Sequence, residues 1–229
     1  PLSISQIIKL TNISKPSTHR IVNLLCDFGL IERHQNRIGY QAGKLMIKMA
    51  HRALNNNYSS DLQTLLMDRL MNHIGETVNY GVFSGSKVTY VNRVEAKWPL
   101  GLRFDVGSQV PAHCTSIGKL MLALLDNKKL TIFLNSMELT RYTPYTITDP
   151  KKLRTQLTKI RKTEIGFDEQ EFMDGVVCVA VPVRTEQGYL LGGLAASAPQ
   201  ARMTLQEMLD VVPDLKRTAS EIANVYSWS

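Results

Sequence analysis

The sequence has few cysteines and no long apolar run. Its three cysteines, Cys26, Cys114 and Cys178, are widely spaced and odd in number. This pattern argues against a disulfide framework and fits a reducing cytosol. The longest apolar run is far shorter than the roughly 20 residues that a membrane-spanning helix needs. No charged-then-apolar leader opens the sequence. We therefore expect a cytoplasmic protein without a membrane partner.

Motifs of common catalytic and cofactor sites are also absent. The sequence contains no C-x-x-C pair, no H-E-x-x-H motif, no phosphate-binding loop and no nucleotide fingerprint. Its five histidines are scattered along the chain, which gives no candidate metal site. We therefore expect no cofactor and no metal.

Positive charge is present in excess, and it is concentrated at one end. Residues 1–57 contain eight Lys and Arg against two Asp and Glu, whereas residues 58–229 contain 19 against 18. The 44% of hydrophobic residues leaves ample material for a core and excludes a disordered or collagen-like chain. A basic end on a nearly neutral body is typical of a nucleic-acid-binding module joined to another domain.

The basic end has the pattern of two helices, a short turn between them, and a hairpin. Ser3 and Gln6 form a capping box that opens a predicted helix over 4–11. A second helix is predicted over about 15–28, and residues 30–40 read as a two-stranded wing. This order is the helix-turn-helix layout. The apolar face of the second helix is predicted to contain Ile21, Leu24, Leu25 and Phe28.

The second predicted helix and the wing carry the candidate DNA contacts. Recognition helices read base edges with residues near their N-terminus, and Arg can bind guanine in bidentate fashion. Basic residues of the wing would contact the DNA backbone. An ordinary helix pair with a solvated basic face is the alternative. The candidate DNA-binding residues are Lys15, Pro16, Ser17, His19, Arg20, Asn23, Arg33 and Arg37.

A helix over 44–57 is predicted to follow the wing. Leu45, Met49 and Ala53 lie along one stripe of it, too far from the remaining chain to be buried there easily. We expect this helix to pair with its counterpart in a second subunit. Packing against its own domain is the alternative.

The rest of the chain is predicted to be an α+β domain with an antiparallel sheet flanked by helices. Its strands come in hairpins and do not alternate with helices. The expected strands cover 77–83, 87–94, 100–104, 176–184 and 189–196. The expected helices reach from about 62 to 74 and cover 115–125, 127–136, 150–163 and 205–226, the last with a break near Pro213.

Five blocks of this sequence, in order, resemble the IclR-type family of bacterial transcriptional regulators. They cover residues 14–20, 75–79, 107–119, 141–148 and 166–183. The resemblance implies a winged helix-turn-helix over 1–43, a linker helix over 44–58 and a GAF-like effector domain over 59–229. It also implies a homodimer or a dimer of dimers on a double-stranded DNA operator. In that family a further helix usually precedes the position of Pro1, so the first domain is expected to lack its first helix.

The loop entering the helix near Thr115 is the candidate effector site. A helix start offers unpaired N–H groups and a positive dipole end, which suit the carboxylate of a small organic acid. Related regulators bind effectors about where Ser116 and Ile117 lie. The resemblance implies a site formed by Leu102, Phe104, Val110, Ser116, Ile117, Gly118, Asp168, Val176, Cys178, Ala195 and Ser197.

Several alternatives stay open at this site. Ala195 stands where the family often has Ser, and Cys114 stands where a small Ala is common. Asp168 could be a strand cap and Cys178 a small core residue. Cys114 beside His113 could also mimic the nucleophile of a GAF-like cysteine-dependent enzyme or redox sensor. The preferred interpretation is a regulator without enzymatic activity that controls a catabolic operon, with the effector's identity and the sign of regulation left open.

Overall fold

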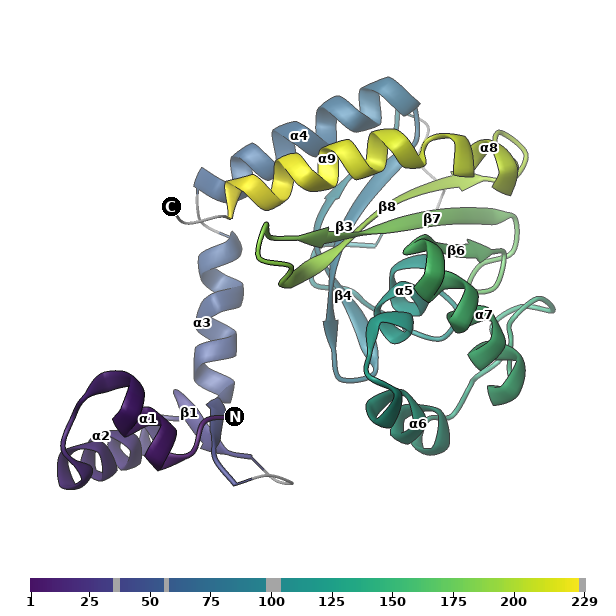
Figure 1. Ribbon diagram of the computed structural model, residues 1–229. Helices are drawn as coiled ribbons and strands as arrows, with labels where there is room; N and C mark the ends of the chain where they lie inside the picture. The colour runs from purple at the N-terminus through teal and green to yellow at the C-terminus, as the bar shows by residue number, and fades with distance from the viewer. Residues whose placement is uncertain (35–37, 56–57, 98–103, 227–229) are drawn as a thin grey trace. The chain divides into compact units, whose positions relative to one another are not determined.

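The computed structural model describes residues 1–34, 38–55, 58–97 and 104–226 (Figure 1). Its contacts divide the chain into two compact units, residues 1–57 and residues 58–229. None of the helices in these described ranges is long and apolar enough to cross a membrane.

The first unit contains the predicted helices and hairpin. The capping box is confirmed, because the Gln6 N–H donates to Ser3 Oγ at 3.3 Å and the Ser3 N–H donates to Gln6 Oε1 at 2.8 Å. Gly29 ends the second helix with a φ of 69°, a left-handed conformation that favours glycine. The elements are α1 (Ile4–Thr11), α2 (Lys15–Asp27), β1 (Ile31–Arg33), β2 (Tyr40–Ala42) and α3 (Lys44–Asn55).

The predicted buried face of α2 is wrong. Thr18 and Val22 are its buried residues, whereas Leu24 and Phe28 are 53% and 62% exposed. The buried stripe is therefore turned around the helix from the one that the apolar residues suggested. The reason is that α2 packs on α1 and β1 through Thr18 and Val22. As a consequence, Arg20 lies nearly opposite the buried stripe at about 100° per residue.

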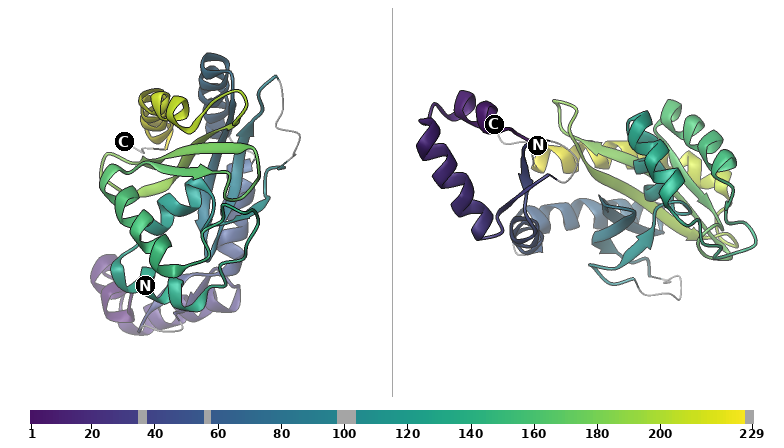
Figure 2. Two further views of the ribbon diagram at one scale, coloured as in Figure 1. Left: turned by 90° about the vertical axis from the view of Figure 1, so that its right-hand side faces the viewer. Right: turned by 90° about the horizontal axis from the view of Figure 1, so that it is seen from below.

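The second unit is built on one six-stranded antiparallel sheet in the order β5-β4-β3-β8-β7-β6. Helices α4, α8 and α9 cover one face, and α5, α6 and α7 lie on the other (Figures 1 and 2). The strands are β3 (Thr77–Ser84), β4 (Lys87–Val94), β5 (Gln109–Pro111), β6 (Gly166–Glu169), β7 (Val176–Arg184) and β8 (Leu190–Pro199). The helices are α4 (Tyr58–Ile74), α5 (Ser116–Leu124), α6 (Asn127–Ser136), α7 (Pro150–Thr163), α8 (Leu205–Asp210) and α9 (Val212–Val225).

Strand alternation divides the interior of this unit into two cores. Side chains at alternate strand positions point to opposite faces of the sheet. The core toward α4, α8 and α9 includes Val177, Val179, Leu194, Leu215 and Ile222. The core toward α5, α6 and α7 includes Val88, Ile117, Leu120, Leu153 and Leu157.

Most predicted elements are confirmed, and the differences concern short edge strands. The bounds of α6 and α7 match the expectation, and the last helix is broken between α8 and α9, with Pro213 in the first turn of α9. The edge strands β5 and β6 were not predicted, because three or four residues are too few to show an alternating pattern. The strand expected over 100–104 falls mainly outside the described residues, and Phe104 itself is not in a strand.

Candidate functional site

A small polar cavity lies on the α5 side of the sheet. Its volume is about 30 Å³, enough for roughly two water molecules. Its wall combines side chains from five strands with the first residues of α5 and a group of aromatic rings. The described residues that line it are Asn79, Tyr90, Arg93, Phe104, Thr115, Ser116, Asp168, Phe172, Met173, Val176, Cys178 and Ser197.

The floor of the cavity is a row of polar side chains, one from each of five neighbouring strands. In the order β4, β3, β8, β7 and β6 they are Arg93, Asn79, Ser197, Cys178 and Asp168. Three of the neighbouring pairs are in direct register, namely Arg93 with Asn79, Ser197 with Cys178, and Cys178 with Asp168. The Asn79 Nδ2 donates to Ser197 Oγ at 3.2 Å and bridges the remaining gap. The row has a cation at one end and a carboxyl group at the other.

A β-bulge places Arg93 in this row. The register of β4 against β3 shifts between Tyr80 and Gly81. Tyr90, before the shift, and Arg93, after it, both line the cavity. Asn92 points to the other face of the sheet, where its Nδ2 donates to Thr64 Oγ1 of α4 at 2.9 Å. Simple alternation from Val88 would put Arg93 on the α4 face. The sequence pattern therefore gave no signal for Arg93.

The helix start at the cavity has free backbone donors. The hydroxyl of Thr115, the N-cap residue of α5, donates to the Pro111 carbonyl at 2.7 Å and does not cap the helix. The first N–H bonded within the helix is that of Lys119, which donates to Thr115 O at 2.8 Å. Among the hydrogen bonds of the described residues, none starts from the N–H groups of Ser116, Ile117 or Gly118. These groups and the helix dipole suit an anion or a hydroxyl oxygen.

The rings of Tyr90, Phe104 and Phe172 form an aromatic cover within the cavity wall. The ring centroid of Phe104 lies 6.0 Å from that of Tyr90 and 5.9 Å from that of Phe172. Tyr142 continues the group, 5.1 Å from Phe172. Such edge-to-face and tilted contacts stabilise an apolar cover.

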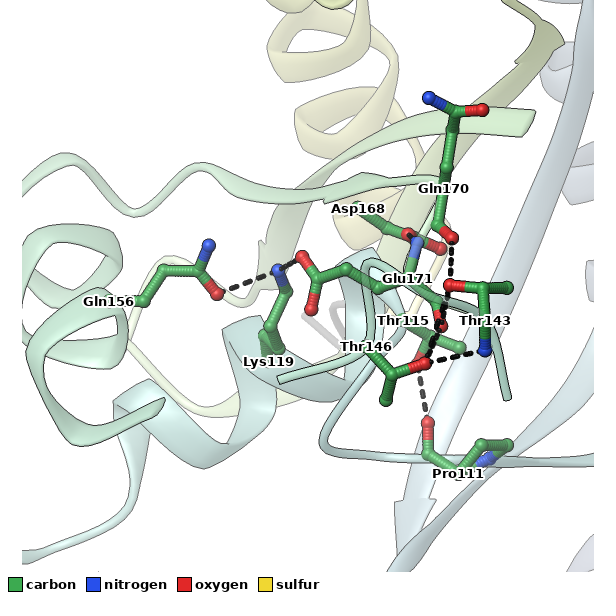
Figure 3. A network of polar contacts seen from close by, with 9 residues as sticks. All are labelled: Pro111, Thr115, Lys119, Thr143, Thr146, Gln156, Asp168, Gln170 and Glu171. Atoms are coloured by element: carbon green, nitrogen blue, oxygen red, sulfur yellow. Dashed lines mark hydrogen bonds and ion pairs between the residues drawn. The ribbon is translucent and has the colours of Figure 1, made fainter. Parts of the chain in front are cut away.

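A buried ion pair supports the Asp168 end of the site (Figure 3). Lys119 of α5 is completely buried, donates to Gln156 Oε1 at 2.8 Å and pairs with Glu171. The backbone N–H of Glu171 in turn donates to Asp168 Oδ1 at 2.8 Å. The Thr146 hydroxyl donates to the Glu171 carbonyl at 2.5 Å. These contacts tie the loop after β6 to α5 and hold the Asp168 carboxyl group in place.

Burial controls the protonation of the carboxyl groups here. It raises the pKa of Asp168 to about 7, although the nearby ammonium of Lys119 opposes this increase. Burial also raises the pKa of Glu171, again against the effect of Lys119. Asp168 is therefore divided between the neutral and charged forms near pH 7, and it can either donate or accept a hydrogen bond.

The cysteines do not have the geometry of a reactive site. Burial raises the pKa of the Cys114 and Cys178 thiols, which disfavours the nucleophilic thiolate. His113 hydrogen-bonds through Nε2 to the Thr140 carbonyl at 3.0 Å, and its Nδ1 has no partner among the described residues. His113 is therefore not hydrogen-bonded to Cys114 as a base would be. The described residues also contain no cluster of three or more side chains able to hold a metal ion.

The structure brings part of the expected effector set together at the cavity. The expected residues that line it are Phe104, Ser116, Asp168, Val176, Cys178 and Ser197. The site residues absent from the expected set are Asn79, Tyr90, Arg93, Thr115, Phe172 and Met173.

Four other expected residues do not line the cavity, and one cannot be placed. Val110, Ile117 and Ala195 belong to the core between the sheet and α5. Gly118 packs so closely that an added Cβ would lie 2.4 Å from Ala112 Cα. Leu102 lies outside the described residues.

The candidate DNA contacts lie mainly on the exposed surface of the first unit. Ser17 is half-buried, and its hydroxyl accepts from Ser14 Oγ at 3.0 Å. The Arg33 guanidinium of β1 lies 5.9 Å from the centre of the Tyr40 ring. Arg37 is outside the described residues. The exposed candidates are Lys15, Pro16, His19, Arg20, Asn23 and Arg33.

Comparisons with known proteins agree on one group. A family model described as the C-terminal region of the bacterial transcriptional regulator IclR matches residues 53–224. The probable transcriptional regulator SauR of Cupriavidus necator is 32% identical over 226 residues, which cover 99% of this chain and 90% of that protein.

Two solved structures extend this likeness to three dimensions. The crystal structure of IclR from Thermotoga maritima matches with a TM-score of 0.70 and 28% identity, over 99% of this chain and 92% of that one. The inducer-binding domain of a double mutant of PobR from Acinetobacter, in complex with 3-hydroxybenzoic acid, matches with a TM-score of 0.68 and 28% identity. That match covers 72% of this chain and 97% of the PobR domain.

Proposed function

Because the chain belongs to the IclR family of bacterial transcriptional regulators, we propose that it is a ligand-responsive, DNA-binding regulator of a catabolic operon. Residues 1–43 form a winged helix-turn-helix that binds a double-stranded operator. Residues 44–58 form a linker helix. Residues 59–229 form a GAF-like effector domain, and the protein works as a homodimer or a dimer of dimers.

The DNA-binding role is supported by the charge and the exposed face of α2. The first unit has a net positive charge of six, from eight basic and two acidic residues. Arg20 lies opposite the buried residues Thr18 and Val22, so its guanidinium is free to reach a base edge. Arg33 is exposed at the end of β1 in the wing, where a backbone contact would position the protein.

The effector role rests on one observation, the polar cavity at the start of α5. It offers free N–H donors, hydroxyls and one arginine beneath an aromatic cover. The inducer-binding domain of a double mutant of PobR, a fold relative, is known in complex with 3-hydroxybenzoic acid, a small hydroxylated aromatic acid. A small organic acid is therefore the class of effector that this cavity suits. Because a small organic acid is larger than a cavity of about 30 Å³, the cavity must widen when the effector binds.

The test fills the cavity with a larger side chain and measures effector binding and operator binding. Ser116→Trp is expected to abolish the stabilisation of the protein by its organic-acid effector, because the indole takes the ligand's space. Ser86→Trp, an exposed position in the β3–β4 turn, is the matched control and should leave it unchanged. Candidate acids are screened by thermal shift, and hits are measured by isothermal titration.

Operator binding, with and without the acid, then decides between the roles. We expect both variants to bind an operator selected from random DNA by the parent protein. Only the parent and Ser86→Trp should change their DNA affinity with ligand, because a ligand must bind one state better to shift the equilibrium. Equal ligand affinity in Ser116→Trp and the parent would place the effector site elsewhere.

A further inference from the structure

Arg93 is a buried cation in the wall of the cavity. Its side chain is only 6% exposed, and it is the one Lys or Arg among the described residues that line the cavity. A buried guanidinium is costly unless its charge and its N–H groups are satisfied. The partners of Arg93 therefore show which part of it is available to a ligand.

A count of donors leaves part of the guanidinium unused. The group has five N–H bonds. Nη1 donates to Asn79 Oδ1 at 2.8 Å, and Nε and Nη2 donate to Glu95 Oε1 at 3.3 and 3.2 Å. Two N–H bonds, one on each terminal nitrogen, have no acceptor among the described residues. Two N–H bonds of one guanidinium are the arrangement that binds a carboxylate in bidentate fashion.

The remaining contacts of Arg93 fix its position and cover it. Asn79 is itself held by its hydrogen bond to Ser197, so the guanidinium is anchored to the middle of the sheet. The Arg93 guanidinium carbon lies 5.9 Å from the centre of the Phe104 ring. Phe104 therefore lies against the guanidinium and belongs to the same cavity wall.

The opposite end of the same row has different chemistry. Asp168 lies on β6, at the far end of the five-strand row from Arg93 on β4. The Asp168 carboxyl group accepts a hydrogen bond from a ligand hydroxyl whether it is protonated or ionised. The hydroxyl groups of Ser116 and Ser197 lie in the same cavity wall. A second anionic group on the ligand would instead face the Asp168 carboxyl group, which disfavours it.

We propose that Arg93 is the carboxylate receptor of the site and selects short hydroxylated monocarboxylates, held with the carboxylate at Arg93 and the hydroxyl toward Asp168. This inference rests on the proposed function, and it identifies the chemical class and the orientation of the effector. It places the carboxylate at the floor of the cavity, because the full charge of a guanidinium attracts it more strongly than the half charge of the α5 dipole.

The experiment measures binding of matched probes to the full chain. The acids are hydroxylated monocarboxylates from glycolate to 3-hydroxybenzoate. Each is paired with its neutral amide, and malonate and isophthalate serve as dicarboxylates. For the parent protein we expect monocarboxylates to bind, and amides and dicarboxylates to bind much more weakly. A parent that binds none of the monocarboxylates at millimolar concentration, or that binds the amides equally well, would overturn the proposal.

Two substitutions then test Arg93 itself. Arg93→Met is expected to weaken monocarboxylate binding by about tenfold to a hundredfold, the effect of one lost charged contact, and to leave amide binding almost unchanged. Arg184→Met removes another arginine that is paired with a glutamate, Glu164, and should have no effect. Equal losses of acid and amide affinity in Arg93→Met would indicate a purely structural role and overturn the proposal.

Glu95→Gln keeps the test decisive if Arg93→Met does not fold. Glu95 is partly exposed and competes for the guanidinium, so its neutral form should increase monocarboxylate affinity severalfold. Unchanged or weaker binding in this variant would contradict the receptor role. The outcome is separable from the proposed function. If acids bind in an Arg93-dependent way but do not change operator affinity, only the proposed regulatory function is refuted. Acid-responsive operator binding that ignores Arg93 would refute only this inference.

Discussion

Lys119 and Glu171 form an ion pair inside the second unit, with the Lys119 side chain fully buried and that of Glu171 5% exposed. The pair joins the second turn of α5 to the loop after β6, and Lys119 also lies 4.7 Å from the centre of the Phe167 ring. Since Glu171 holds Asp168 through its backbone N–H, the pair positions one end of the cavity floor. Its contribution to stability and to the site can be measured separately.

Removing the cation alone should be strongly destabilising. Lys119→Met leaves the Glu171 carboxylate buried without its partner, and breaking such a pair typically costs about 3–5 kcal/mol of unfolding free energy. The double variant Lys119→Met/Glu171→Leu should recover much of that loss, because it leaves no uncompensated charge. Urea unfolding measures both. Lys129→Met, at an exposed pair with Asp126, is the control and should change little. A double variant no more stable than Lys119→Met would contradict this account.

The protonation of Asp168 should make stability depend on pH. Its pKa is raised from 3.8 to about 7 in the folded protein, so the folded state holds the proton more tightly than the unfolded one. The resulting stabilisation is present below about pH 4 and is lost as the pH rises to about 7. That difference in pKa corresponds to roughly 4 kcal/mol.

Asp168→Asn provides the comparison, because the amide oxygen can still accept from the Glu171 N–H. The unfolding free energy of the parent, relative to the variant, should decrease between pH 4 and pH 7, and urea titrations at several pH values measure it. Glu171, Lys119, Tyr90 and Cys178 face this carboxyl group and remain in both proteins. Parallel pH profiles for the two proteins would show that Asp168 does not titrate in this range.

Arg20 should determine part of the DNA specificity. Arg20→Ala is expected to cost about 1–3 kcal/mol of binding free energy on the selected operator, and less on random DNA, because a bidentate base contact is lost. Arg33→Ala, at the exposed position in β1 that is proposed to contact the DNA backbone, is the matched loss of one charge. It should weaken both DNAs equally and reduce the salt dependence. Identical binding by Arg20→Ala and the parent would exclude a base contact.

The exposed apolar side chains of α3 should mediate assembly. Leu45 and Met49 are 40% and 54% exposed, so the first unit does not bury them. Pairing of α3 with the same helix of a second subunit would bury both side chains. Leu45→Lys/Met49→Lys is expected to shift a dimer toward monomer and weaken operator binding. Light scattering at micromolar concentration measures the change, with Lys44→Glu/Lys48→Glu as the control on the same helix. A monomeric parent would refute the prediction.

Local signals in the sequence determined most of the secondary structure and the division of charge. Helices were predictable because their two signals, a capping residue and apolar residues spaced three or four apart, both lie within the segment that forms the helix. Ser3 with Gln6 opens α1, and Asp149 before Pro150 opens α7, where the Asp149 carboxylate accepts the Lys151 N–H at 2.8 Å. The α5 start was predicted from the chemistry of a helix N-terminus and Asp168 from the resemblance to a family, and both line the same cavity.

Only the tertiary structure decided which side chains face one another. The apolar residues of α2 indicated one buried face, but packing on its neighbours selected Thr18 and Val22. Arg93 reaches the cavity because a bulge shifts the register of β4, and alternation along the sequence would have turned it away. Register and helix rotation depend on partners that are distant in the chain, so a periodic pattern alone could not assign Arg93 to one end of the cavity floor.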